Sequence, residues 1–199
     1  MVLMATKKKQ AKGRKKPTSK KSTSEAPAKA SAKLTAGQKS ETRASFDKPL
    51  RDHVLFLLKG GGAHASFDDT LKDWPLEFSG IKVAKFPHTA WMLLEHIRLG
   101  QWDILEFSCD SKHVSPKWPE GYWPASAAPP SEEAWKASMA ACEKDLRAME
   151  RLVADAKVDL FARIPGGDGQ TILREALLLA DHNAYHLGQL MMLRKSLGI

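Results

Sequence analysis

Three histidines in two separate segments of this chain have the types and spacing to bind one metal ion. His182 and His186 are four residues apart in a segment with helical periodicity, so their side chains lie on one helix face, one turn apart. His96 lies in a second helical segment, on a face shared with Leu93 and Leu99. Neutral imidazoles can reach a common ion at ~2.0–2.1 Å per nitrogen, and they suit Zn, Ni or Fe(II). Three protein ligands leave a coordination position open, which is typical of a catalytic rather than a structural site.

The spacing alone does not distinguish this site from a set of buried, hydrogen-bonded histidines, because two histidines four residues apart also occur by chance. Asp181 and Gln189 could orient a ligand histidine, and the polar groups around a metal site often do so. His64, which follows a run of three glycines, could approach the site or simply begin a helix. Asp181 is more readily interpreted as such an orienting group or a surface acid than as a general base. The residues that carry the chemistry itself stay unassigned.

Four helical segments are expected to position these histidines. Apolar residues recur at helical spacing over four ranges, and no alternating strand pattern is present. The ranges are roughly 50–73 (interrupted at Gly60–Gly62), 87–107, 131–157 and 171–197. The pattern predicts an all-α fold, a four-helix bundle formed by residues 46–199.

A proline-rich loop over residues 110–130 contains three large aromatic residues, Trp118, Tyr122 and Trp123. A plain linker has no need of such side chains, so we expect the loop to pack over the helices or to line a pocket. In one interpretation the aromatic residues form the apolar wall of a small-molecule site. In the other, which we favour slightly, they plug the end of the bundle.

The N-terminal 45 residues differ in composition from the rest of the chain. They contain eleven Lys, two Arg and two Glu, a net charge of +11, whereas the whole chain has +8, which leaves −3 for residues 46–199. With almost no large apolar side chains, residues 1–45 are predicted to be disordered. They could contact nucleic acid non-specifically through their charge, or serve only as a solubilising leader. The acidic balance of residues 46–199 argues against a folded basic nucleic-acid-binding domain.

Cysteine usage and hydropathy indicate a cytoplasmic protein. Cys109 and Cys142 are isolated from each other, which is typical of a reducing compartment rather than of a disulfide framework. No apolar run approaches the roughly 20 residues that span a bilayer, so no membrane association is expected. The N-terminus also lacks the apolar region of a secretory signal.

Two segments resemble the DinB superfamily, a group of helical proteins that includes bacterial thiol transferases. In residues 87–97, Trp91 stands five residues before His96, and residues 181–190 contain the pattern His-x-x-x-His-x-x-Gln. The resemblance covers residues 50–197. It implies a four-helix bundle with up-down-down-up connections and a divalent metal held by His96, His182 and His186. It also implies that the chain forms homodimers.

Three functional hypotheses follow. The first is a metal-dependent enzyme, a thiol S-transferase or a hydrolase, because some DinB-like relatives use a metal-bound thiolate of a small cellular thiol. The second is a non-enzymatic stress or nucleoid-associated protein, with a metal-stabilised bundle and a nucleic-acid-binding tail. The third is a small-molecule binding module without turnover. The sequence identifies neither the substrate nor the metal.

Overall fold

The computed structural model describes residues 35–199, and these residues fold into helices without a strand. The prediction of an all-α fold is therefore confirmed for this range. The α-helices are α1 (Ala36–Lys59), α2 (Phe67–Leu71), α3 (Ala90–Cys109), α4 (Glu132–Ala154) and α5 (Ile172–Leu197). Two 3₁₀ turns, η1 (Leu76–Phe78) and η2 (Glu120–Tyr122), lie in the connections. None of the helices in the described range is long and apolar enough to cross a bilayer.

The N-terminal helix differs from the predicted one. One interrupted helix was predicted over residues 50–73. The structure has two helices there: α1, which begins earlier, at Ala36, and the short α2. The break falls at the glycines as expected, because Gly60 and Gly61 have φ values of 67° and 77°, a conformation that favours glycine. The predicted tail boundary at residue 45 thus lies inside α1, and residues 1–34 of the predicted disordered tail lie outside the described range. Residues 47–199 form one compact unit.

The other three long helices begin and end close to the predicted positions, because side-chain caps fix their ends. Thr89, Ser131 and Thr171 each accept a hydrogen bond from a backbone N–H in the first turn of α3, α4 and α5. Gly198 ends α5 in the left-handed conformation, with φ 73°. Pro87 was predicted as the first helical residue of α3, but the cap at Thr89 makes Ala90 the first.

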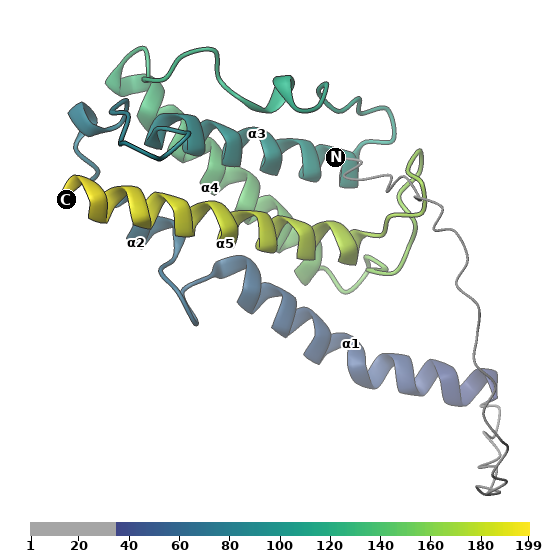
Figure 1. The fold of residues 1–199 in the computed structure, drawn as a ribbon. Coiled ribbons are helices and arrows are strands. Elements are labelled where there is room, and N and C mark those ends of the chain that lie inside the picture. Colours follow the sequence, from purple (N-terminus) through teal and green to yellow (C-terminus); the bar gives the residue numbers. More distant parts are fainter. Residues whose placement is uncertain (1–34) are drawn as a thin grey trace, which may run out of the picture. The chain divides into compact units, whose positions relative to one another are not determined.

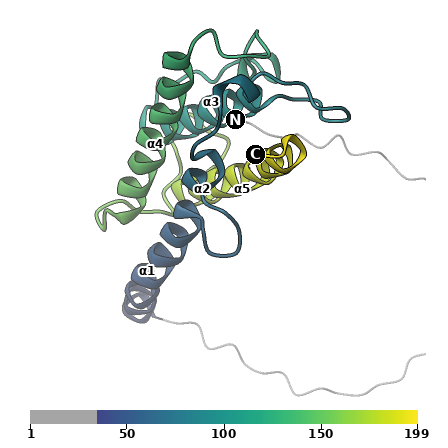
Figure 2. The same ribbon diagram turned by 90° about the vertical axis from the view of Figure 1, so that its left-hand side faces the viewer.

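Helix α3 is the centre of the compact unit. It packs against both α4 and α5; in Figure 1 α5 runs beside it and α4 crosses it obliquely, and α2 lies against α5 (Figure 2). Its apolar residues face in several directions, and Leu94, Ile97 and Ile104 are fully buried. A helix that is covered on most sides buries side chains on several of its faces. His96 is one of these buried side chains.

The loop between α3 and α4 runs back along α3 (Figure 1), and the 3₁₀ turn η2 contacts that helix. Tyr122 is buried, Trp123 is half-buried and Trp118 is 51% exposed. The expectation that this loop packs over the helices is confirmed for Tyr122 and Trp123. Trp118 faces solvent, although its ring centroid lies 5.3 Å from that of Tyr122.

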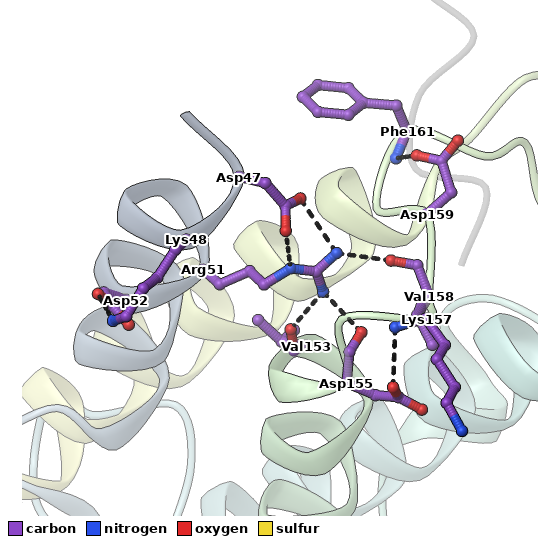
Figure 3. A network of polar contacts seen from close by, with 10 residues as sticks. All are labelled: Asp47, Lys48, Arg51, Asp52, Val153, Asp155, Lys157, Val158, Asp159 and Phe161. Carbon is purple, nitrogen blue, oxygen red and sulfur yellow. Dashed lines mark hydrogen bonds and ion pairs between the residues drawn. The ribbon is translucent and has the colours of Figure 1, made fainter. Parts of the chain in front are cut away.

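A buried arginine joins α1 to the end of α4 (Figure 3). Arg51 is 6% exposed, and its guanidinium donates to both carboxylate oxygens of Asp47, at 2.7 and 3.1 Å. The same group donates to the backbone carbonyls of Val153, Asp155 and Val158 at 2.6–2.9 Å. Because the last carbonyls of a helix lack intrahelical partners, Arg51 caps α4 from another helix.

Candidate metal centre

The side chains of His96, His182 and His186 come together between α3 and α5. One ring nitrogen from each lies within 4.8 Å of the other two, and Nε2 of His96 is 3.1 Å from Nε2 of His182. The ring centroids of the three pairs are 4.5–4.9 Å apart. His96 and His186 are 3% and 7% exposed, and His182 is partly buried. A buried group of this kind could hold a metal ion.

Hydrogen bonds at the far side of two rings orient their remaining nitrogens. Nδ1 of His96 lies 2.9 Å from the backbone carbonyl of Tyr122, and Nδ1 of His186 lies 3.1 Å from Oε1 of Gln189. Both partners are oxygen acceptors, so each Nδ1 carries the proton and donates it. Each neutral ring then has its lone pair on Nε2, the form that binds a metal.

The spacing of one pair of nitrogens, those of His96 and His182, fits a shared ion. Two nitrogens that each lie ~2.0–2.1 Å from one tetrahedral ion are about 3.3 Å apart. The 3.1 Å separation of the His96 and His182 Nε2 atoms is close to this value. Without an ion, the same contact is a hydrogen bond in which His182 donates to His96. In that case Nδ1 of His182 is an acceptor, and it is buried with no hydrogen-bond partner among the described residues.

Burial keeps the three imidazoles neutral. Desolvation, followed by repulsion from His186 and His96, lowers the pKa of His182 to about 3. Desolvation and repulsion from His96 lower the pKa of His186 to about 4, and desolvation also lowers the pKa of His96. At neutral pH all three rings are therefore neutral, each with one N–H and one lone pair, and protons compete little with a metal ion for these lone pairs.

A glycine on α3 makes room for His182. A Cβ atom at Gly100 would lie 2.8 Å from Cε1 of His182 and 3.4 Å from each of its ring nitrogens. Gly100 is one turn beyond His96, so the backbone of α3 forms a wall against which the His182 ring lies. A glycine inside a helix costs about 1 kcal/mol relative to alanine, and here the space left by the missing side chain is filled by the imidazole.

We expect Gly100→Ala to displace His182 and to weaken metal binding by about tenfold or more, the size of effect seen when a group that orients a ligand is lost. Gly188→Ala is the matched control. Gly188 also lies inside a helix, α5, but a Cβ atom there would meet nothing within 4 Å. The control should keep wild-type affinity and gain about 0.5–1 kcal/mol of stability. Competition titration against a chromogenic zinc chelator measures the affinity of each variant, and urea unfolding measures the stability. Equal affinity of the two variants would contradict the role of Gly100.

Aromatic rings flank two of the histidines. The Trp123 ring stacks on His96, with centroids 4.0 Å apart and an interplanar angle of 3°. It also stacks on His88, at 4.0 Å and 17°. Tyr185 lies edge-on to His186 at 4.8 Å. These rings restrict the orientation of the histidines and present apolar surface beside them.

The other residues predicted near the site divide into two sets, apart from the exposed Trp118, whose ring contact among the described residues is with Tyr122 and not with a histidine. Tyr122, Trp123 and Gln189 contact the histidines as described above. His64 and Asp181 do not join the group. Both are exposed, and Nδ1 of His64 lies 2.9 Å from the carbonyl of its neighbour Ala65.

Sequence reasoning missed several buried polar residues on α3. Asp103 is fully buried, and its carboxylate accepts hydrogen bonds from the Tyr122 hydroxyl at 2.7 Å and from Nε2 of His113 at 2.8 Å. His113, which has no motif around it in the sequence, is half-buried at this contact. Burial raises the pKa of Asp103, but the hydrogen bonds from Tyr122 and His113 outweigh it, and the net pKa is lowered.

A second buried carboxylate, Glu95, lies beside His96 in the sequence but takes part in a different set of contacts. It accepts hydrogen bonds from Ser138 on α4 at 2.5 Å and from Arg98 at 2.8 Å. A signal for both acids was available, since Glu95 and Asp103 lie in a helix whose apolar residues cover more than one side. A polar residue in such a position is usually paired.

Comparison with known proteins identified no relative, since no family model, curated protein or solved structure matches this chain. The resemblance to the DinB superfamily remains a prediction from two sequence segments. The case for a function therefore depends on the geometry and chemistry of the three histidines.

Proposed function

We propose that this chain is a divalent-metal-binding protein that uses an open three-histidine site as a thiol S-transferase or a hydrolase. The observation that carries the proposal is the convergence of His96, His182 and His186, from two helices, within 4.8 Å of one another. The orientation of two Nε2 lone pairs by Tyr122 and Gln189 supports it, because such hydrogen bonds accompany metal-binding histidines.

The chemistry of the ligands favours an anionic partner at the open position. All three ligands are neutral, and the group contains no carboxylate or thiolate among the described residues. Three neutral ligands do not neutralise the +2 charge of a divalent ion, so an anionic thiolate or hydroxide would be favoured as a fourth ligand. A bound ion of this kind acidifies a thiol or water at its open position and so supplies a nucleophile near neutral pH. Trp123 and Tyr185 provide apolar surface beside the histidines that suits the carbon skeleton of a small substrate.

The same proposal includes a DinB-like four-helix bundle made of α1, α3, α4 and α5. The packing of α3 against α4 and α5 supports this arrangement. Helix α1 contributes Val54 and Leu58 to a buried apolar cluster that also contains Ile104 of α3 and Met149 of α4. An experimental structure would test the arrangement, and an α1 detached from this cluster would contradict it.

Metal loading followed by a substrate screen tests the function. Protein purified without a histidine tag should bind one Zn, Ni or Fe(II) per chain. With the preferred ion, it should transfer a small thiol to an electrophile or hydrolyse an activated ester or amide. A chelator should abolish turnover. Absence of bound metal would overturn the whole proposal, whereas stoichiometric metal without turnover for any thiol or hydrolysable substrate would overturn only the enzymatic part.

A further inference from the structure

The buried carboxylate of Asp103 lies on α3 two turns after His96, on a similar face of the helix. It is 0% exposed. An ionised carboxylate in such a position is unfavourable unless its oxygens are paired. Its two oxygens accept from groups that both belong to the loop between α3 and α4. Oδ1 accepts from His113, and Oδ2 accepts from the hydroxyl of Tyr122.

Tyr122 is held at both ends. Its hydroxyl donates to Asp103 at 2.7 Å, and its backbone carbonyl accepts from Nδ1 of His96 at 2.9 Å. The next residue, Trp123, stacks on the His96 ring at 4.0 Å. One short stretch of loop therefore sets both the hydrogen bond and the ring plane of His96.

Regular secondary structure in this loop is limited to the three-residue turn η2, so side-chain contacts must fix its position on α3. The hydrogen bonds that Asp103 accepts attach the loop at two points nine residues apart in the sequence, His113 and Tyr122. A loop attached only by packing could shift along α3 by fractions of an ångström. Such a shift would lengthen the 2.9 Å bond to His96 and turn its Nε2 away from the other two histidines.

We propose that Asp103 is a positioning residue for the metal centre. It fixes Tyr122, whose carbonyl holds His96 as the Nδ1–H tautomer with its Nε2 directed at His182 and His186. This inference depends on the proposed metal binding and extends it to a residue that touches none of the three ligands in the described contacts.

Two substitutions test the inference at the two ends of one hydrogen bond. Tyr122→Phe removes the hydrogen bond between the hydroxyl and the carboxylate and leaves the backbone carbonyl in the chain, whereas Asp103→Asn leaves one acceptor oxygen for two donors, the Tyr122 hydroxyl and the His113 ring. We expect each to weaken zinc binding by about 10–100-fold, the range found for outer groups that orient a ligand histidine. The double variant should bind no more weakly than the weaker single variant, because both changes break the same link.

Two further measurements separate positioning from general loss of stability. The visible absorption spectrum of the cobalt(II)-loaded protein reports ligand geometry, and the imidazole ¹⁵N chemical shifts report the tautomer of His96 with or without metal. Both should change in the two variants. Glu95→Gln is the matched control, because Glu95 is a buried, hydrogen-bonded carboxylate on the same helix whose partners are Ser138 and Arg98. The control should keep the wild-type spectrum and zinc affinity.

The outcomes distinguish the inference from the proposed function. Wild-type affinity and spectrum in both Asp103→Asn and Tyr122→Phe would overturn the role of Asp103 and leave the metal site standing. An equal loss of zinc affinity in Glu95→Gln would also overturn the role of Asp103, because it would show that the loss comes from a general decrease in stability. If the wild-type protein binds no metal, the proposed function fails and the role of Asp103 at a metal centre fails with it.

Discussion

Replacing His186 with alanine is expected to reduce the bound metal from about one ion per chain to a trace. His186 is 7% exposed and supplies one of only three nitrogens in the cluster, so no other described residue of the group can replace it. The melting temperature should fall as well, because a ligand present at 100 times its Kd contributes about 2.7 kcal/mol to the stability of the native state. Elemental analysis of untagged protein measures the first effect, and thermal unfolding measures the second.

The chelated protein provides the control for this prediction. With metal removed from both proteins, the difference in melting temperature between wild type and His186→Ala should shrink to the effect of losing a buried ring. His64→Ala should leave the metal content unchanged, because His64 is exposed and lies outside the cluster. An unchanged metal-to-protein ratio in His186→Ala would count against the proposed site.

Replacing Arg51 with alanine is expected to destabilise the fold by about 3 kcal/mol, because it removes a buried guanidinium that makes five hydrogen bonds, and a hydrogen bond to a charged group contributes about 1.5–3 kcal/mol. The substitution leaves the carboxylate of Asp47 without its guanidinium, and the carbonyls of Val153, Asp155 and Val158 lose the hydrogen bonds that this group donates (Figure 3). Arg51→Lys should recover only part of the loss, because one ammonium cannot reproduce the forked set of donors. Urea unfolding followed by circular dichroism measures the change.

The neighbouring ion pair on the same helix is a matched control. Lys48 and Asp52 are also joined over one turn, at 2.6 Å, but their side chains are 82% and 55% exposed. Lys48→Ala should change the free energy of unfolding by no more than about 0.5 kcal/mol, because exposed pairs are weak. A similar effect for Arg51→Ala and Lys48→Ala would show that burial of the guanidinium does not stabilise the end of α4.

The sequence predicted the helices where local chemistry decides their limits. The predicted ranges that start at 131 and 171 begin at the capping residues Ser131 and Thr171, and the range that stops at 197 ends before Gly198, because caps and left-handed glycines act within a few residues. The start of α1 was missed. Its first residues are rich in Lys, Ser and Thr and give no apolar periodicity, so pattern alone could not extend the helix back to Ala36.

The pairing of His182 with His186 was also readable from the sequence, because four residues of helix place two side chains on one face whatever surrounds them. The third histidine, His96, was proposed from its place on another helical segment, and the motif resemblance supported that choice. Only the packing of α3 against α5 brings the third nitrogen to 3.1 Å from His182.

The remaining features of the site were decided by tertiary structure. In the sequence, Gly100 is a glycine that would destabilise a helix. In the fold, it provides the space beside α3 in which the His182 ring lies. His64 and Asp181 are close to the motifs in the sequence, yet both face solvent. Asp103 and His113 show no motif, and they acquire a role because a loop without regular structure folds back along α3. Helical periodicity and capping act over one or two turns and are encoded locally, whereas the contacts that orient a ligand depend on which surfaces meet across the core.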